Sequence, residues 1–447
     1  MNYMPVTKRL IGGSGVTYNN SFVSFPLCCP SRATHLSGQH AHNHGVKDNV
    51  IAHGGGNDSF DHTNTVPVWL QRAGYATAHV GKYLNEYGET SAPNVPPGYD
   101  DFFATIDPST YQFWNYDVFD NGTRRSFGSA TEDYQTDVVA KRAVDDITRL
   151  GAQTKPFYLT VWPLAPHSST GKGSVVPLAP APAPRHVGTK PNVRAPRPAS
   201  FMEADRNDKP KALLDLLDRI ADEVAKSGTT QEQVEALLDQ IQQARAESLL
   251  AVDELVQKVI DALTATGQIE NTVVVFTSDN GWMMGEHAIT LGKVVPYEES
   301  IRVPLLVRGP GFPKGASANQ PVSNVDVPAT VLEVAAAAAG IPQEGTSLLP
   351  VAKDPNLRKD RAVLIESTAN GVQAYQGIRT AGWSYVRYAE DGGEELYDLF
   401  ADPYQLENRI ADPTFAKARD RFRREVERLG ACKGSACLTM IPGSDLR

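Results

Sequence analysis

The run Val273-Val274-Val275-Phe276-Thr277 is apolar and mostly β-branched from end to end, with no alternation of polar and apolar residues. This pattern is typical of a strand that is buried on both faces. Such strands are found in sheets that carry helices on both sides. We therefore predict an α/β fold in which a mostly parallel sheet lies between two helical layers.

Predicted strands and helices alternate along the first three quarters of the chain, as an α/β fold requires. Further strands are predicted over 75–80, 157–162 and 303–307, and helices over 65–73, 131–150 and 231–264. The segment 168–210 is rich in Pro, Ala and Gly and is predicted to be irregular.

The pattern changes after about residue 341. Shorter strands are predicted over 362–365, 377–380 and 383–387, followed by a helix over 414–429. We therefore predict two parts, a catalytic domain over 1–340 and a smaller α+β subdomain over 341–447.

The composition argues against two classes of partner. The chain has 447 residues, which is enough for a large core. Its net charge of −9 does not suit a broad nucleic-acid surface. No apolar run reaches the roughly 18 residues that a membrane helix needs. We expect no nucleic acid and no membrane span, although a local basic pocket could still bind an anionic substrate.

Polar residues follow the predicted strands where each of them ends. Lys82 follows the strand 75–80, His167 follows 157–162, and Asp279 and Asn280 follow 273–277. Open α/β sheets bind ligands at the carboxyl ends of their strands, so we expect these side chains to meet in one site. The oxygens of Asp279 and Asn280 suit a hard cation such as Ca²⁺, although an isolated Asp-Asn-Gly is more often only a turn.

A thiol stands directly before Pro30-Ser31-Arg32, at the start of a short predicted helix, in the run Cys28-Cys29-Pro30-Ser31-Arg32-Ala33-Thr34-His35-Leu36-Ser37-Gly38. The amino terminus of a helix favours negative charge, so a nucleophilic Cys28 is well placed there. A simple thiol nucleophile and a small core residue are the alternatives.

Four segments resemble the formylglycine-dependent (type I) sulfatases. The run from Cys28 is similar to their signature C-x-P-S-R with a distal Leu-Ser-Gly, and residues 74–82 are similar to their second signature G-Y-x-T-x-x-x-G-K. The Asp279-Asn280 turn resembles their metal motif, and residues 292–304 resemble the segment whose lysine, here Lys293, binds sulfate. Gly81-Lys82-Tyr83-Leu84-Asn85 resembles the N-acetylglucosamine-6-sulfatase branch in particular.

The resemblance implies an alkaline-phosphatase-like α/β/α sandwich and a defined set of roles. A formylglycine-generating enzyme would convert Cys28 to Cα-formylglycine, whose hydrate attacks the sulfur of a sulfate ester. Arg32 would hold this group, and Lys82, His167 and Lys293 would bind the sulfate and assist the leaving oxygen. Cys28, Asp279 and Asn280 would ligate Ca²⁺ or Mg²⁺.

The implied activity is sulfuric ester hydrolysis, on sulfated sugars such as N-acetylglucosamine-6-sulfate or on aryl sulfates. Two alternatives are a phosphonate monoester or phosphodiester hydrolase of the same superfamily and a truncated homologue without activity. His42 or His44 is a further candidate for the pocket wall, because the branch has a similar His-Asn-His stretch.

Sulfatases usually begin with a buried strand that ends in Asp-Asp, and both residues bind the metal. No such element precedes Cys28, so the resemblance implies a catalytic domain that is incomplete at its amino end and lacks two metal carboxylates. This leaves open whether the chain as it stands is active.

A full-length form is expected to be secreted or periplasmic, although the residues from Met1 show no signal-peptide pattern. Cys432 and Cys437 could close a short disulfide, which would fit an oxidising compartment, or could be free thiols.

Overall fold

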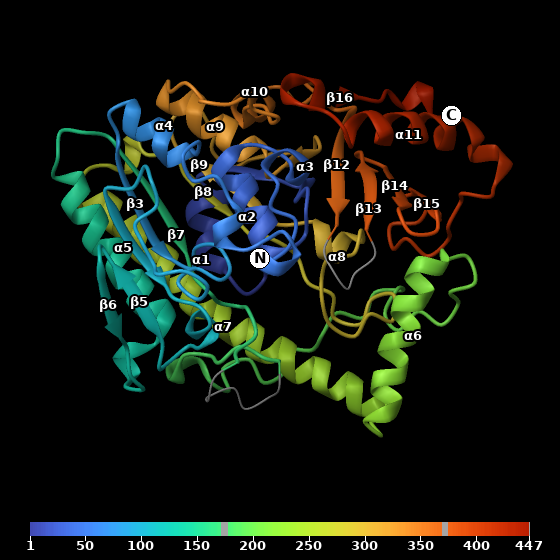
Figure 1. Cartoon of the computed structure of the whole chain (residues 1–447), viewed down its shortest axis with the longest axis horizontal. Helices are drawn as coiled ribbons and strands as arrows, with labels where there is room; N and C mark the ends of the chain where they lie inside the picture. The colour runs from blue at the N-terminus through green and yellow to red at the C-terminus, as the bar shows by residue number, and fades with distance from the viewer. Residues whose placement is uncertain (171–177, 369–373, 447) are drawn as a thin grey trace.

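The computed structural model describes residues 1–170, 178–368 and 374–446 (Figure 1). The strand predicted over 273–277 is β8 (Val274–Thr277), and all four of its residues are half-buried. It pairs on one edge only among the described strands, antiparallel with β9 (Leu305–Arg308). Val274 and Phe276 pack against one apolar cluster and Val273 and Val275 against another, so both faces are covered as predicted, and the strand is only half-buried because its second edge lines a cavity.

The strands of the α/β part form two sheets of four and five strands. The first has the order β10–β1–β9–β8, with β10 at Ala316–Ala318 and β1 at Gly15–Tyr18. The second has the order β6–β5–β4–β3–β7, with bounds Thr123–Ser126, Asp117–Asp120, Asp101–Thr105, Ala76–Gly81 and Phe157–Trp162. β3 pairs in parallel with both β4 and β7, whereas β9 is antiparallel to both of its neighbours.

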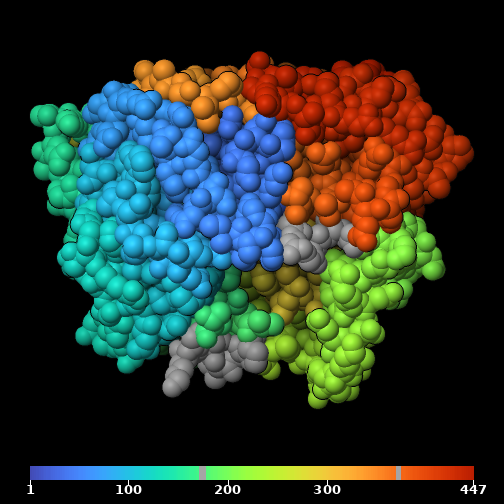
Figure 2. Space-filling view, viewed as in Figure 1, coloured from blue at the N-terminus to red at the C-terminus, as the bar shows by residue number. Residues whose placement is uncertain are grey.

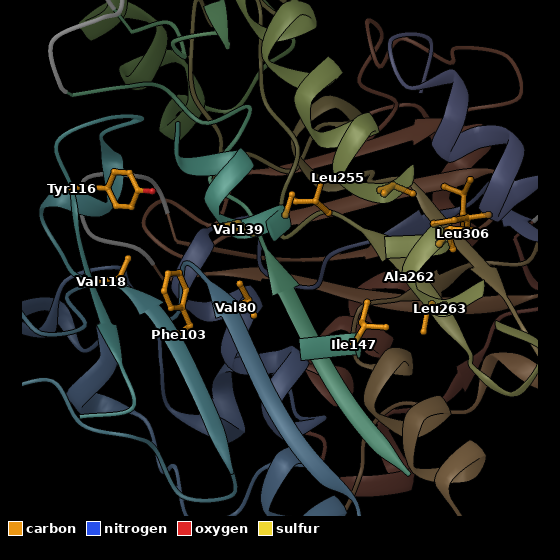
Figure 3. Packing of buried hydrophobic residues seen from close by; sticks show 14 residues of the cluster. Val80, Phe103, Tyr116, Val118, Val139, Ile147, Leu255, Ala262, Leu263 and Leu306 are labelled. Carbon is orange, nitrogen blue, oxygen red and sulfur yellow. The ribbon is translucent and has the colours of Figure 1, made fainter. Parts of the chain in front are cut away.

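One helical layer spans both sheets. The long helix α7 (Gln231–Ala265) packs against α5 (Gln135–Gly151), and their apolar side chains share one cluster with those of the strands. Figure 3 shows Val80 of β3 and Leu306 of β9 in this cluster, together with Leu255 of α7. The two sheets therefore share one hydrophobic layer even though their strands do not pair with one another.

A second helical layer covers the opposite face. It contains α2 (Cys28–Ser37), α4 (Val66–Arg72) and α9 (Asp326–Ala335). Trp69 and Leu70 of α4 pack with Leu332 of α9, and Tyr158 of β7 lies against the same cluster. The predicted α/β/α arrangement is confirmed.

The last strands form a sheet of their own. Its order is β15–β14–β13–β12–β16, every pair is antiparallel, and the helix α11 (Ala416–Leu429) packs on it. The strand bounds are Glu394–Asp398, Trp383–Tyr388, Tyr375–Arg379, Arg361–Ser367 and Thr439–Met440. Cys432 and Cys437 are disulfide-bonded, so the short disulfide that the sequence left open is present.

Several elements were not predicted from the sequence. They include the strands β4, β5, β6, β10, β15 and β16, a two-stranded sheet of β2 (Ser21–Phe22) and β11 (Val322–Ser323), and the helices α1 (Pro5–Thr7), α3 (Ala41–His44), α6 (Lys211–Lys226), α8 (Glu298–Ile301), α9 and α10 (Leu348–Lys353). Of the expected irregular segment, residues 178–210 contain one short 3₁₀ turn, Pro184–His186, and residues 171–177 lie outside the described part. None of the described helices combines the length and the hydropathy that a bilayer span requires.

The amino-terminal part is tied to the carboxyl-terminal part by buried polar contacts. In Figure 2 the blue residues after the amino terminus pack directly beside the orange segment. Arg361 of β12 makes two hydrogen bonds to Asp326 of α9, at 2.6 and 2.9 Å, and both side chains are almost fully buried. A second polar contact between the two parts is made by His42 of α3, which contacts the carboxylate of Glu366 and the carbonyl oxygen of Cys432.

His42 is held in its protonated form by two acceptors. Its Nδ1 lies 2.9 Å from Glu366 Oε2 and its Nε2 lies 3.0 Å from the Cys432 carbonyl oxygen, so both ring nitrogens must carry a proton. Burial lowers the pKa of His42, but the hydrogen bond and charge of Glu366 outweigh it and raise the pKa above its ordinary value. Protonation of His42 therefore favours the folded state.

We expect the His42→Gln substitution to destabilise the protein more at about pH 6 than at about pH 9, with a difference of at most about 1 kcal/mol. A raised pKa makes the contribution of His42 full below the pKa of the unfolded chain, about 6.5, and removes it as the pH rises through the folded value. Urea unfolding at both pH values measures this. His53→Gln is the control, because His53 is exposed and lies 3.9 Å from Asp48; an equal pH effect in both variants would contradict the prediction.

Candidate active site

The side chains that were predicted to meet do lie together, at the carboxyl ends of three strands. Lys82 follows β3, His167 follows β7, and Asp279 and Asn280 follow β8. These residues, together with Arg32 and Lys293, line one end of a cavity of about 810 Å³. The first residue of α2 is Cys28, which is 2% exposed and lies beside this end.

The position of Cys28 is set by the point at which the helix α2 begins. Leu27 before it is extended, with φ −145° and ψ 145°, and α2 ends at Gly38, whose φ of 71° is left-handed. The ammonium of Lys293 donates a hydrogen bond to Cys28 Sγ at 2.8 Å and one to Asn280 Oδ1 at 3.1 Å. Asn280 Oδ1 is itself 3.6 Å from the sulfur, so three predicted site residues are in direct contact.

The two adjacent thiols differ strongly in acidity. Burial raises the pKa of Cys28, but the charges of Lys293 and Lys82 and a hydrogen bond from His167 outweigh it and hold the pKa well below its usual value. Burial raises the pKa of Cys29 to about 12. Cys28 is therefore the ionised, reactive thiol of the pair, whereas Cys29 is a neutral core residue.

We expect the Lys293→Met substitution to raise the pKa of the Cys28 thiol, because it removes the ammonium group that donates a hydrogen bond to the sulfur and stabilises the thiolate. Thiolate absorbance in the ultraviolet, followed against pH in the protein expressed without a maturing enzyme, measures this. Lys141→Met is the control, because the side chain of Lys141 is 77% exposed and pairs with Asp145 on the surface. An unchanged titration in Lys293→Met would show that Lys293 does not control the thiol.

Arg32 connects the nucleophile helix to the end of β8. Its Nε donates to Asp279 Oδ2 at 2.8 Å, and its Nη1 donates to the carbonyl oxygen of Lys82 at 2.7 Å. Burial raises the pKa of Asp279, but Arg32, Lys293 and Lys82 outweigh it and keep the pKa well below its usual value. Asp279 is therefore a carboxylate at neutral pH, and its charge is shared among three cations.

Lys82 and His167 both contact the ring of Tyr111. The Lys82 ammonium is 4.7 Å from the centre of the Tyr111 ring, and the His167 ring is 5.0 Å from it. His167 Nδ1 is 2.9 Å from the Ser168 carbonyl oxygen, which can only accept, so Nδ1 carries a proton. That hydrogen bond fixes the orientation of the imidazole.

Three residues of the site were not predicted from the sequence. Tyr111 supplies a ring that both Lys82 and His167 contact, and Trp282 supplies a ring with Lys293 at 5.7 Å and Arg245 at 5.9 Å from its centre. Trp282 stands two residues after Asn280, so the turn motif could have indicated it. Tyr111 ends the short 3₁₀ helix Ser109–Tyr111 and Arg245 lies in the middle of α7, and no local pattern marks either of them.

His42 and His44 do not line the cavity. His42 makes the contacts with Glu366 and Cys432 described above, and His44 Nε2 lies 3.2 Å from Thr34 Oγ1. The proposal that either histidine forms part of the pocket wall is therefore wrong, because both rings are used to hold α3 in place.

The described residues do not make a complete site for the implied cation. Ca²⁺ takes about six to eight oxygen ligands, whereas the site offers one carboxylate, Asp279, and the amide oxygen of Asn280. Arg32 already bonds the first, and Lys293 the second. The one cluster of three His, Cys, Asp or Glu residues found in the described part is His40 with the two disulfide sulfurs. We therefore assign no step of the reaction to a metal ion.

Comparison with known proteins places this geometry in context. A family model described as Sulfatase matches residues 1–337, and one described as N-sulphoglucosamine sulphohydrolase, C-terminal, matches residues 285–431. An arylsulfatase of Volvox carteri is 33% identical over 492 residues, covering 97% of this chain and 72% of the relative. An N-acetylglucosamine-6-sulfatase of Homo sapiens is 32% identical over 483 residues, covering 98% of this chain and 83% of the relative.

Solved structures share the fold. A protein in complex with its substrate D-glucosamine-2-N,6-O-disulfate has a TM-score of 0.76 at 24% identity, covering 95% of this chain and 92% of that one. A phosphonate monoester hydrolase of Agrobacterium radiobacter has a TM-score of 0.67 at 22% identity, covering 96% of this chain and 90% of that one. The predicted alkaline-phosphatase-like sandwich is confirmed by these likenesses.

Proposed function

The chain belongs to the sulfatase family and is a sulfuric ester hydrolase, and on this premise we propose that the group that attacks sulfur derives from Cys28. The observation that carries the proposal is the contrast between neighbouring thiols, since Cys28 is held ionised by Lys293 and Lys82 while the pKa of Cys29 is raised to about 12. An anionic group at Cys28 is stabilised before any substrate arrives.

We propose further that a formylglycine-generating enzyme oxidises Cys28 to Cα-formylglycine. A hydrated aldehyde there would supply an oxygen nucleophile, and its second hydroxyl would allow sulfate to be released, which a plain alcohol or thiol does not. The surroundings suit an oxyanion, because the Lys293 ammonium lies 2.8 Å from Sγ and the residue begins the ten-residue helix α2.

The remaining side chains bind the sulfate ester and supply a proton to its leaving group. Lys82 and Lys293 neutralise the sulfate oxygens, and Arg32 holds Asp279 and the β3 loop in position beside them. His167, with the Nδ1 proton held by the Ser168 carbonyl oxygen, is a proton donor through Nε2 only as the imidazolium, and in that form it gives the Nε2 proton to the leaving alcohol and becomes neutral. Lys293 is the second group near enough to the nucleophile to assist the leaving oxygen.

The substrate class is proposed to be a sulfated sugar of the N-acetylglucosamine-6-sulfate type. The support is the Gly81-Lys82-Tyr83-Leu84-Asn85 segment, together with the named human relative, which aligns over 98% of this chain. Aryl sulfates are the simpler substrates of the same reaction. The disulfide between Cys432 and Cys437 supports a location in an oxidising, extracytoplasmic compartment.

Coexpression with a formylglycine-generating enzyme tests the proposal. Intact mass and peptide mapping should show loss of the thiol at Cys28 and not at Cys29. The converted protein should release sulfate from 4-nitrophenyl sulfate and from N-acetylglucosamine-6-sulfate. Complete conversion without sulfate release from either compound would overturn the proposal.

A phosphonate monoester or phosphodiester hydrolase is the second candidate, because a phosphonate monoester hydrolase has the same fold at a TM-score of 0.67. Turnover of phenyl phosphonate esters and of bis-4-nitrophenyl phosphate, measured beside 4-nitrophenyl sulfate on one preparation, separates the two. We expect the sulfate ester to be preferred.

A further inference from the structure

A buried histidine lies against the disulfide of the carboxyl-terminal segment. His40 immediately precedes α3, and its side chain is buried, as are those of Cys432 and Cys437. One ring nitrogen of His40 and the two sulfurs all lie within 4.8 Å of one another. These three atoms are close enough to meet around one small ion, and we call the three residues the His-Cys-Cys cluster.

Glu344 fixes the orientation of the His40 ring. Its Oε2 lies 2.9 Å from His40 Nδ1 and 2.6 Å from the backbone nitrogen of His40, and its Oε1 accepts a hydrogen bond from Asn43 Nδ2 at 2.6 Å. A carboxylate only accepts, so Nδ1 carries a proton and Nε2 is the nitrogen that can offer a lone pair. Carboxylates orient metal-binding histidines in this way. Glu344 therefore holds His40 in a tautomer that can bind a metal.

The chain around the two cysteines is held in place by more than the disulfide. The carbonyl oxygen of Cys432 accepts hydrogen bonds from His42 Nε2 at 3.0 Å and from Asn43 Nδ2 at 2.7 Å. Just beyond Cys437, β16 pairs with β12, and both cysteines pack in the apolar cluster of α11. The disulfide also closes a loop of only a few residues, which constrains the unfolded chain less than a long loop would. We therefore expect the reduced thiols to stay beside His40.

The ligand atoms of the cluster are those of a zinc site. The two cysteines have four residues between them, which is within the C-x₂₋₄-C spacing of zinc-binding proteins. Thiolate and imidazole ligands favour zinc over Ca²⁺ or Mg²⁺. Two thiolates also neutralise the charge of Zn²⁺, so the complex can be buried at little electrostatic cost. Bonded sulfurs cannot do this, because the sulfurs of a tetrahedral zinc site lie about 3.8 Å apart.

We propose that the His-Cys-Cys cluster is a redox-dependent zinc site, which binds Zn²⁺ through His40 Nε2 and both thiolates once the disulfide has been reduced. Reduction by a dithiol breaks the S–S bond, gives two electrons and two protons to the sulfurs, and leaves the reductant as a disulfide. Zn²⁺ then displaces both thiol protons, while Nε2 contributes its lone pair without loss of a proton. Water completes the four ligands.

The two states tie different parts of the protein together. The disulfide joins two residues of one short loop, whereas zinc also joins them to His40 and so to α3, which packs against α2. The disulfide is the stable form in an oxidising compartment, so the zinc form belongs to chains that dithiols still keep reduced. The proposal does not depend on sulfate-ester hydrolysis, because no residue of the active site takes part.

Zinc titration of a protein with two thiols tests it. In the Cys28→Ala/Cys29→Ala double variant, Cys432 and Cys437 are the only cysteines that remain. The protein is reduced with dithiothreitol, freed of the reductant under argon, and titrated with Zn²⁺ in competition with a chromogenic chelator. We expect one Zn²⁺ per chain, bound about 100-fold or more tightly than by the oxidised protein. Equal affinity of the two forms, or displacement of Zn²⁺ by Ca²⁺ at equal concentration, would overturn the proposal.

The role of His40 is tested by His40→Gln in the same background. The glutamine keeps a donor for Glu344 but lacks the ring lone pair, so zinc affinity should fall by about 100-fold or more. His53→Gln is the control, because His53 is exposed and lies outside the cluster, and its affinity should stay within about threefold. Equal affinity of the two variants would show that the thiols bind zinc without His40.

X-ray absorption at the zinc edge gives the same answer without a substitution at His40, in case that variant does not fold. The reduced, zinc-loaded double variant should show two sulfur ligands at about 2.3 Å and one imidazole nitrogen at about 2.0–2.1 Å. A spectrum with no imidazole, or with one sulfur, would overturn the assignment. Zinc should also slow alkylation of both cysteines by iodoacetamide by about tenfold or more, since a bound thiolate is not free to react. Alkylation at the same rate with and without zinc would contradict the proposal.

Discussion

We expect a Cys28→Ala variant to turn over 4-nitrophenyl sulfate about 10⁴-fold more slowly, or worse, than the converted wild-type protein, because it lacks the group that is proposed to form the covalent bond and keeps only binding and electrostatic stabilisation. Steady-state kinetics with each protein coexpressed with the maturing enzyme measures this. Binding of inorganic sulfate should remain, since Lys82, His167 and Lys293 are untouched.

Cys29→Ala is the matched control. Cys29 is the next residue of the same helix and is fully buried, yet the pKa of its thiol is raised to about 12 and its side chain packs with Tyr83 and Phe102. We expect its turnover to stay within about threefold of the wild type and its stability to fall by about 1 kcal/mol. Equal loss of turnover in both variants would show that the helix, and not the Cys28 group, is what the reaction requires.

Asp326→Ala is expected to lower the free energy of unfolding by about 3–5 kcal/mol, because it leaves the buried guanidinium of Arg361 without its charge partner. The side chain of Asp326 is 0% exposed and that of Arg361 is 4% exposed. Asp326 also accepts from the backbone N–H groups of Ser323 and Thr346, each at 2.8 Å. The substitution therefore leaves four donor contacts, three of them buried, without their acceptor.

Urea unfolding followed by circular dichroism measures this loss, with Asp145→Ala as the control. Asp145 pairs with Lys141 at 2.6 Å, but the two side chains are 57% and 77% exposed, so its removal is expected to cost less than about 0.5 kcal/mol. Similar midpoints for the two variants would mean that the Asp326–Arg361 pair does not hold α9 against β12.

The pattern of apolar and polar residues predicted a helix or strand well where the pattern extends over the whole element. The bounds of β7, Phe157–Trp162, agree with the prediction, and α7 ends one residue later than expected. β6 was missed because its Thr-Arg-Arg-Ser sequence is exposed and polar, and its strand exists only by pairing with β5. The two covered faces of β8 were predicted, but its exposed edge was not, because the pairing of an edge is set by the strands beside it, which a run of valines does not specify.

The residues of the candidate site also fall into two groups, those that a local sequence pattern indicates and those that it does not. Cys28, Lys82 and Asp279 could be found because each stands in a motif next to the end of a predicted element. Arg245 and Tyr111 could not be found from the sequence, because their positions depend on how α7 and the segment before β5 pack in the folded protein. His42 was misplaced for a related reason, since its partners Glu366 and Cys432 lie more than 300 residues further along the chain.

The long-range contacts of α3 set an order of events during synthesis. The segment that carries Cys28 leaves the ribosome early, but Glu366 and Cys432, which hold His42 in place, are made last. At about 5–20 residues per second, the roughly 400 residues between Cys28 and Cys432 take on the order of 20–80 s. Until then α3, which packs against the helix that carries Cys28, lacks its final anchor. If Cys28 is converted as we propose, this interval is the time in which the modifying enzyme would reach it before the protein is fully folded.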